Sequence, residues 1–129
     1  MKIIIATFAL VFAFAMTGMS QTPEYLTVKS GKQGIAKKSK LRIKFISLVE
    51  DSRCPEGVNC VWAGNAKIKV KLSNGQTSKE FEFNSNDGPK GDSFDGWAVY
   101  LEELTPYPKQ GKAATGHYKA KFKVIRLTR

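Results

Sequence analysis

Hydrophobic and polar residues alternate with a period of two along most of the chain after residue 21. Residues 66–72, which read AKIKVKL, show the pattern clearly, because lysines separate apolar residues at every second position. Such alternation is typical of a β-strand that packs one face on a core and turns the other to water. Comparable runs predict further strands at 25–28, 34–36, 41–48, 80–83, 97–104 and 118–127. The pattern therefore predicts an all-β fold, a single-domain antiparallel sandwich or small barrel of six to seven strands.

Asn74 and Gly75 stand between two of these runs, and an Asn-Gly pair is typical of a tight β-hairpin turn. If these two residues form the whole loop, apolar residues face apolar residues and lysines face glutamates across the hairpin. The predicted opposed pairs are Ala66 with Phe83, Lys67 with Glu82, Ile68 with Phe81, and Lys69 with Glu80.

The alternation changes phase in two places. The run that begins at Leu41 shifts its apolar positions at Ile46, which predicts a β-bulge or a strand end buried on both faces. A similar change occurs at Ile125. Residues 84–96 and 109–116 are rich in turn-forming residues, and we predict loops there.

Residues 1–20 have the features of a cleavable signal peptide. Lys2 supplies a positive charge, residues 3–16 are almost entirely apolar, and small residues precede the predicted cleavage before Gln21. The apolar run is too short to favour a permanent membrane span. We therefore expect a single β domain, 21–129, that is secreted or periplasmic and has no transmembrane anchor in its mature form.

The chain has two cysteines, Cys54 and Cys60, and in an exported protein such a pair predicts a disulfide. Pro55 and Gly57 inside the closed loop favour a tight turn. Closing so short a loop stabilises the fold by about 2–2.5 kcal/mol in the chain-entropy description. The alternatives are a redox or metal site, but the spacing is not CxxC and two thiols do not complete a zinc site.

Residues 51–66 read DSRCPEGVNCVWAGNA, and residues 101–108 read LEELTPYP. Together with the order of the strands around them, these segments resemble a family of small exported bacterial proteins that share the segment DSRCPxxxxCxWxGxA. The resemblance covers nearly the whole chain after the leader. It implies an exported all-β domain, and it implies no established activity, so it transfers no catalytic residues to this chain.

The residues that carry most enzyme chemistry are scarce. His117 is the single histidine of the chain, and no nucleophile-elbow segment such as GxSxG is present. One histidine and two oxidised cysteines leave a transition-metal site without enough ligands. Glu102 and Glu103 are adjacent on a predicted strand, so we expect them to point to opposite faces. We therefore predict no catalytic residues, no metal site and no cofactor.

A group of side chains with carboxylate and amide oxygens lies in the predicted loop 84–96. These oxygens are the ligands that calcium prefers, but their spacing does not match an EF-hand loop. A solvated turn is the favoured interpretation, and calcium binding is the alternative. The residues are Asn84, Asn86, Asp87, Asp92 and Asp95.

We predict a candidate binding loop around the disulfide, formed by Arg53, Glu56, Val58 and Trp62. A rigid loop bounded by cysteines is typical of protease inhibitors, and here it would present Glu56 and Val58. Asp51 and Arg53 are expected to pair with each other or to hold neighbouring backbone. Trp62 is expected to pack in the core against the disulfide, with a stacking platform for a sugar or peptide as the alternative.

The formal net charge is +10, and lysines supply most of the positive charge. Two sets of three lysines each occupy the polar positions of one predicted strand. Arg42 and Lys44, on the strand predicted over 41–48, would extend these stripes if the strands are neighbours. Such a face would attract a polyanion, although a solvated face that blocks aggregation is the simpler interpretation. Aromatic residues lie on the core-facing phase, so specific nucleic-acid binding is not expected. The stripes are Lys67, Lys69 and Lys71, and Lys119, Lys121 and Lys123.

The sequence thus favours a secreted or periplasmic, non-catalytic binding or inhibitor-like module that presents a disulfide-closed loop. Its partner would be an unknown protein or an anionic component of the cell envelope. One alternative is a small envelope hydrolase or metal-binding enzyme. Another is a structural envelope protein with a polyanion-binding lysine face.

Overall fold

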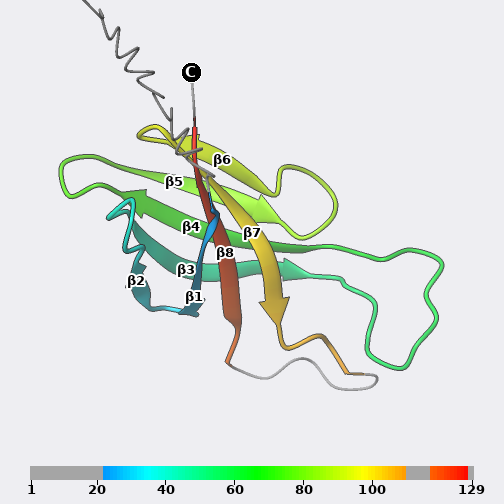
Figure 1. The fold of residues 1–129 in the computed structure, drawn as a ribbon. Helices are drawn as coiled ribbons and strands as arrows, with labels where there is room; N and C mark the ends of the chain where they lie inside the picture. The colour runs from blue at the N-terminus through cyan, green and yellow to red at the C-terminus, as the bar shows by residue number, and fades with distance from the viewer. Residues whose placement is uncertain (1–21, 110–116, 128–129) are drawn as a thin grey trace, which may run out of the picture.

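Eight β-strands form two antiparallel sheets in the computed structural model, which describes residues 22–109 and 117–127 (Figure 1). One sheet has the strand order β1-β8-β7-β6, and the other has the order β2-β3-β4-β5. The predicted all-β sandwich is therefore confirmed, but the described residues form eight strands rather than the six to seven predicted. The strands are β1 (Glu24–Lys29), β2 (Gln33–Ile35), β3 (Arg42–Asp51), β4 (Ala66–Ser73), β5 (Ser78–Asn84), β6 (Gly91–Phe94), β7 (Trp97–Thr105) and β8 (Lys119–Arg126).

Two predictions fall partly or wholly outside the described residues. The leader predicted over residues 1–20 and its cleavage site lie there, as does most of the loop predicted over 109–116. Within the part of the chain that is described, no helix has the length and apolar character needed to cross a membrane.

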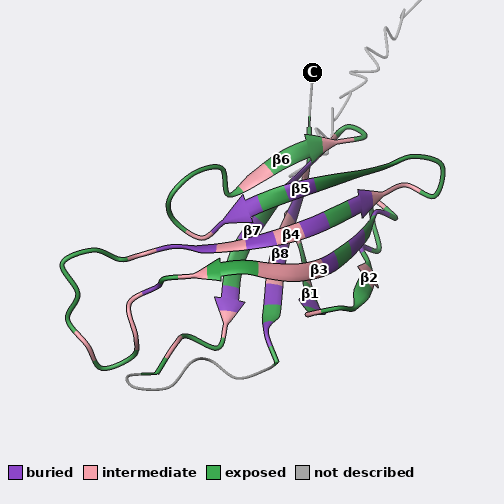
Figure 2. Ribbon diagram, turned by 180° about the vertical axis from the view of Figure 1, so that it is seen from behind, coloured by how far each residue is buried: buried purple, intermediate pink, exposed green. Residues whose placement is uncertain are grey.

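The apolar side of the alternation forms the core between the two sheets (Figure 2). Phe83 of β5 and Phe122 of β8 are fully buried and meet edge to face, with ring centroids 6.4 Å apart. At one side of the sandwich, Phe81 of β5 meets Phe94 of β6 in the same way, also at 6.4 Å. Burying each such side chain contributes about 1.5–3 kcal/mol. This core fixes the strands that carry the surface features described below.

The hairpin between β4 and β5 is present, but its predicted register is wrong by two residues. Ile68 lies opposite Phe83 and Lys69 opposite Glu82, because the loop has four residues, 74–77, rather than two. The side-chain oxygen of Asn74 accepts hydrogen bonds from the backbone N–H groups of residues 76 and 77, at 2.9 and 2.7 Å, and thereby closes the wider loop. A shift of two residues keeps every side chain on its predicted face.

The two predicted ion pairs of this hairpin are present, but their residues lie diagonally across the strands rather than directly opposite each other. Lys69 Nζ lies 3.3 Å from Glu80 Oε2, and Lys67 Nζ lies 3.9 Å from Glu82 Oε2. Diagonal positions on one sheet face are close enough for long side chains to meet. These exposed pairs contribute little to stability, and they neutralise part of the lysine stripe on β4.

The bulge predicted near Ile46 is confirmed, because the register between β3 and β4 shifts between Phe45 and Ser47 and again between Leu48 and Glu50. The phase change at Ile125 has no counterpart in the register of β8. The remaining irregularity lies in β7.

Strand β6 lies inside the segment 84–96 that was predicted to be a loop, and this prediction is wrong for Gly91–Phe94. Asp95 and Gly96 connect β6 to β7, and both have positive φ, at 50° and 80°. Positive φ at both central residues is what a two-residue type I′ hairpin turn requires. The formation of β6 therefore depends on its turn and on its pairing with β7 more than on the apolar content of its sequence.

Candidate functional site

The candidate site is the disulfide loop, residues 54–64, which extends beyond the ends of β3 and β4 (Figure 1). The two arms of the loop stay paired at their base. Ser52 N–H donates to Asn65 O at 2.7 Å, and Cys54 N–H donates to Ala63 O at 3.0 Å. The predicted disulfide between Cys54 and Cys60 closes the far part, with Cα atoms 5.9 Å apart.

Gly64 allows the two arms to lie this close. Its φ is +72°, and a Cβ atom built on it would lie 1.9 Å from the carbonyl oxygen of Ser52. Side chains essentially never approach a backbone oxygen so closely, and L residues rarely adopt this φ. The glycine of the CxWxG segment is thus required by the pairing at the base of the loop.

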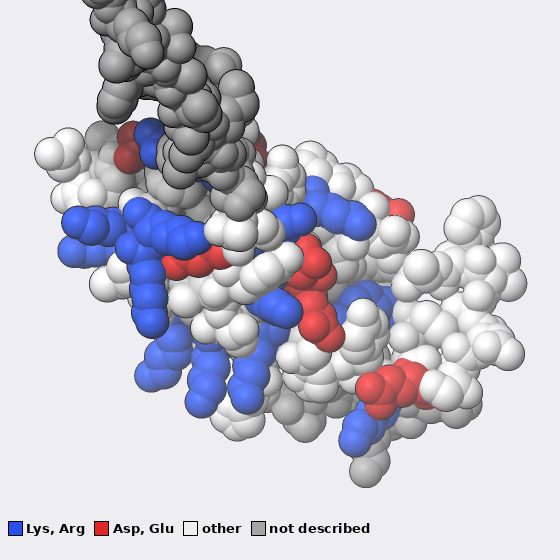
Figure 3. Space-filling view, viewed as in Figure 1, with Lys and Arg blue, Asp and Glu red and all other residues white. Residues whose placement is uncertain are grey.

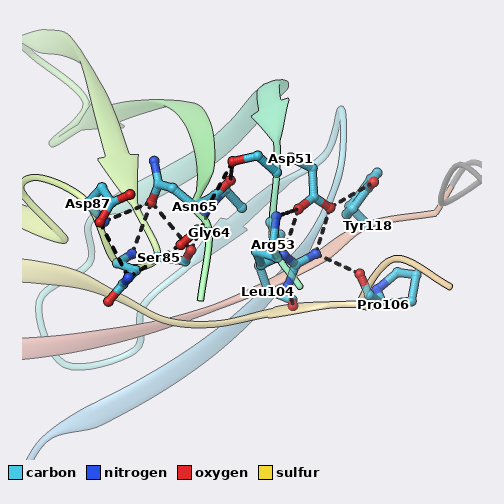
Figure 4. A network of polar contacts seen from close by, with 12 residues as sticks. Asp51, Arg53, Gly64, Asn65, Ser85, Asp87, Leu104, Pro106 and Tyr118 are labelled. Atoms are coloured by element: carbon cyan, nitrogen blue, oxygen red, sulfur yellow. Dashed lines mark hydrogen bonds and ion pairs between the residues drawn. The ribbon is translucent and has the colours of Figure 1, made fainter. Parts of the chain in front are cut away.

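Arg53 fastens the base of the loop to the other sheet (Figure 4). Its Nε donates to Asp51 Oδ1 and its Nη2 to Asp51 Oδ2, both at 2.8 Å. Nη1 donates to the carbonyl oxygen of Leu104, and Nη2 donates to that of Pro106 at 2.7 Å. The guanidinium stacks on Tyr107, 4.4 Å from the ring centroid. We call this arrangement the Arg53 clamp.

The Arg53 clamp is buried, since the side chains of Arg53 and Asp51 are 5% and 7% exposed. The prediction that these residues pair and hold neighbouring backbone is confirmed. Arg53 uses its donors inside the protein, so it is not available to a partner, and its place in the predicted binding loop is corrected accordingly. Its function is to connect the extension of β3 to the end of β7.

The electrostatics of the clamp favour its ionised form. Burial raises the pKa of Asp51, but the hydrogen bonds and positive charge of Arg53 outweigh it and hold the pKa of Asp51 below its usual value. Burial lowers the pKa of Arg53, and Asp51 more than offsets this, so the guanidinium stays protonated. Tyr118 donates its hydroxyl to Asp51 Oδ2 at 3.2 Å, and burial together with the Asp51 charge raises the pKa of Tyr118.

The lowered pKa of Asp51 predicts acid sensitivity. A carboxylate has a pKa of about 3.9 in an unfolded chain, so the clamp contributes fully above that pH and loses its contribution as the pH falls through the lower, folded value. We expect the urea midpoint of the wild type to fall below about pH 4 more steeply than that of Asp51→Asn. Asp95→Asn, an exposed change in the β6–β7 turn, should follow the wild type. If the urea midpoint of Asp51→Asn falls with pH as steeply as that of the wild type, the Asp51 carboxylate does not cause the acid sensitivity.

A second set of hydrogen bonds anchors the loop to the Asx-rich segment after β5 (Figure 4). Asn65 is buried, and its side-chain oxygen accepts hydrogen bonds from the backbone N–H groups of Asn86 and Asp87, both at 3.0 Å. Its Nδ2 donates to Asn84 Oδ1 at 3.0 Å. The amides predicted to form a turn are thus used to hold the loop. Within residues 22–109 and 117–127, no group of three or more His, Cys, Asp or Glu residues could hold a metal ion.

Beyond these anchors the loop presents two apolar side chains. Val61 is 91% exposed and Trp62 is 82% exposed. The prediction that Trp62 packs in the core is therefore wrong, because the loop carries it past the end of both sheets. Glu56 is exposed, and its N–H donates to Pro108 O at 2.9 Å. Val58 is half-buried, so the residues presented to solvent are Val61 and Trp62 more than the predicted Val58.

The two lysine stripes do not form one face. The stripe on β4 lies on the outer side of the sheet β2-β3-β4-β5, and the stripe on β8 lies on the outer side of the sheet β1-β8-β7-β6. Because the core separates the sheets, these stripes face opposite directions. Arg42 and Lys44 extend the stripe on β4, since β3 and β4 are neighbours and Lys44 lies opposite Lys71.

Glu102 and Glu103 do not point to opposite faces as predicted. The register of β7 with β8 is irregular between Leu101 and Glu103, and both glutamates are exposed and line one groove. Leu101 and Leu104 are both buried, and two apolar residues three positions apart in a strand require such a bulge. That spacing is a signal that sequence reasoning missed.

His117 lies just before β8 and is exposed.

Comparison with known proteins gives no relative: no family model, curated protein or solved structure matches this chain.

Proposed function

We propose that this protein is a secreted or periplasmic, non-catalytic binding module that holds a protein partner through its disulfide loop. The observation that carries the proposal is the exposure of Val61 and Trp62, two consecutive residues on a loop whose base is fixed. A tryptophan exposed to this extent costs solubility, and clusters of exposed apolar residues typically mark interaction sites.

Three connections support a rigid presentation of these two residues. The disulfide closes the loop, the Arg53 clamp ties its first arm to β7, and Glu56 bonds to Pro108. A loop that is already ordered loses less conformational entropy when it binds. Tryptophan is enriched among the few interface residues that carry most of the binding free energy. An inhibitor-like mode, in which the loop enters an apolar pocket of an enzyme, fits the same geometry.

Site-specific photo-crosslinking tests the proposal. A photoreactive phenylalanine analogue at position 62 should give an adduct of defined mass when the exported protein is exposed to its own envelope and medium. The same analogue at Gln76, in the exposed β4–β5 loop on another part of the molecule, is the control. Equal adducts from both positions, or none from position 62, would refute the proposal.

The captured partner then allows a quantitative prediction. Trp62→Ser should weaken its binding by about 30-fold or more in a calorimetric titration, the loss typical of a central interface tryptophan. Ile35→Ser removes an apolar residue that is 56% exposed on β2, and it should leave the affinity within about twofold. If Trp62→Ser binds as the wild type does, the loop is not the contact surface.

A further inference from the structure

A groove lies beside the bulge of β7, and its origin is the short length of β6. Strand β6 pairs with β7 from Trp97 to Tyr100, and Leu101 N–H then donates to Lys90 O at 2.7 Å. Farther along β7, Arg53 donates a hydrogen bond to the carbonyl oxygen of Leu104. Residues 101–104 of β7, between these two contacts, line a groove with a volume of about 370 Å³.

The side chains of the groove combine three kinds of recognition chemistry. Lys90 and Lys123 supply ammonium groups, and Glu102 and Glu103 supply carboxylates. Tyr100 and Tyr107 add aromatic side chains, and these residues are 40% and 43% exposed. Stacking of Arg53 on Tyr107 holds one of these rings in place. A small number of polar groups converging with aromatic surface is typical of a ligand site.

The groove continues into the outer face of the sheet β1-β8-β7, which we call the β8 face. Lys123 lies between Tyr25 of β1 and Tyr100 of β7, and Lys119 lies directly opposite Lys29. Figure 3 shows Lys and Arg side chains over much of this side of the molecule, with a few acidic side chains among them. In the part of the chain that is described, no ion pair neutralises the lysines of β8.

Aromatic residues therefore do interleave with lysines on this face, contrary to the expectation that they all lie on the core-facing phase. Tyr25 and Tyr100 flank Lys123, and Lys121 Nζ lies 4.9 Å from the centroid of the Tyr25 ring. Neighbouring same-face residues of a strand are about 7 Å apart. The β8 face thus offers a row of charges at regular intervals, with rings beside them.

We propose that the groove and the β8 face bind an acidic oligosaccharide. Carboxylate or sulfate groups of the glycan would meet the lysines, and the apolar faces of its sugar rings would stack on the tyrosines. Glu102 and Glu103 would accept hydrogen bonds from sugar hydroxyls, which are donors. In single-stranded DNA the donors lie on the bases, away from the charged backbone, whereas a uronate residue carries hydroxyl donors and its carboxylate on the same ring. Charge complementarity and the acceptors in the groove together favour the glycan.

Calorimetry with the purified protein at 0.15 M salt tests this proposal. The probes are a hexamer of galacturonic acid, a neutral hexamer of galactose, and a thymidine heptamer with six phosphates. We expect measurable binding of the uronate hexamer, at least about tenfold tighter than either other probe. Tighter binding of the thymidine heptamer would identify a nucleic-acid surface instead, and absence of uronate binding would overturn the proposal.

Two triple variants separate a built site from bulk charge. Exchanging Lys119, Lys121 and Lys123 for Gln should weaken uronate binding by about tenfold. Exchanging Lys67, Lys69 and Lys71 for Gln removes the same charge from the opposite face and should change it by less than about twofold. Equal losses in the two variants would mean nonspecific attraction and would overturn the proposal.

Replacement of the two glutamates distinguishes most clearly between recognition of sugar hydroxyls and simple charge attraction. Glu102→Gln with Glu103→Gln makes the protein more positive, so simple attraction predicts tighter binding of the uronate hexamer. Recognition of sugar hydroxyls predicts weaker binding, by about twofold or more, because charge-assisted hydrogen bonds are lost. Tighter binding by this variant would overturn the proposal. Failure of any of these arms leaves the function proposed for the disulfide loop unaffected, since Trp62 is not part of the groove.

Discussion

The Arg53→Ala variant is expected to unfold with a free energy about 3–5 kcal/mol lower than that of the wild type, the loss typical of breaking a buried ion pair from one side. The change leaves the Asp51 carboxylate, 7% exposed, without its cation. It also leaves the carbonyl oxygens of Leu104 and Pro106 without their donor. A domain of this size has a total stability of about 5–15 kcal/mol, so much of it would be lost. Urea denaturation followed by tryptophan fluorescence measures the effect.

Two companion variants make the Arg53 result interpretable. Arg42→Ala removes an exposed arginine from β3, and it should change the free energy of unfolding by no more than about 0.5 kcal/mol. Arg53→Lys keeps the positive charge and loses the planar guanidinium with its forked donors. Its free energy of unfolding should therefore lie between those of the wild type and Arg53→Ala, and it should still give a measurable unfolding transition. A loss in Arg53→Ala as small as that of Arg42→Ala would show that the clamp does not stabilise the fold.

Gly64→Ala should lower the free energy of unfolding by about 2–5 kcal/mol. About 1–2 kcal/mol comes from a left-handed backbone conformation, and about 1–3 kcal/mol from forcing extra volume into a filled space. The new Cβ would lie 1.9 Å from Ser52 O, so the arms at the base of the loop must separate. Thermal unfolding of the variant gives the loss directly.

Gly57→Ala is the matched control for this prediction. Gly57 lies in the same loop with φ +78°, and a Cβ atom there would meet nothing within 4 Å. Gly57→Ala should therefore lower the free energy of unfolding by about 1–2 kcal/mol, the cost of the left-handed backbone conformation alone. If the two alanine variants are equally stable, the close approach of Gly64 to Ser52 does not limit the fold.

The period-two alternation was sufficient to predict most of the sandwich, because it records directly which side chains face the core. It placed β4 and its buried face correctly, and it detected the bulge in β3. It missed β6, whose residues are GDSF, since a short edge strand with one apolar residue carries almost no periodicity. The remaining signal for β6 is the Asp95-Gly96 turn, which lies inside the loop predicted over residues 84–96.

The site was harder to predict, because its contacts join residues far apart in the sequence. Arg53 donates to a carbonyl oxygen 51 residues away, a contact that neither residue type nor local spacing reveals. The sequence predicts that Trp62 packs in the core against the disulfide, whereas the loop carries it into solvent. A buried arginine and an exposed tryptophan therefore reverse the usual order of burial at this end of the molecule.

The first described strand, β1, is hydrogen-bonded to the last, β8, and β8 in turn joins β1 to β7. One sheet of the sandwich therefore depends on pairing with β8, the last strand described, while the other, β2-β3-β4-β5, pairs strands that are consecutive in the sequence. Pairings of such wide sequence separation form slowly. Deletion of β8 would remove the neighbour that β1 and β7 share and would expose their core-facing side chains, and we expect such a protein to be degraded rapidly by proteases.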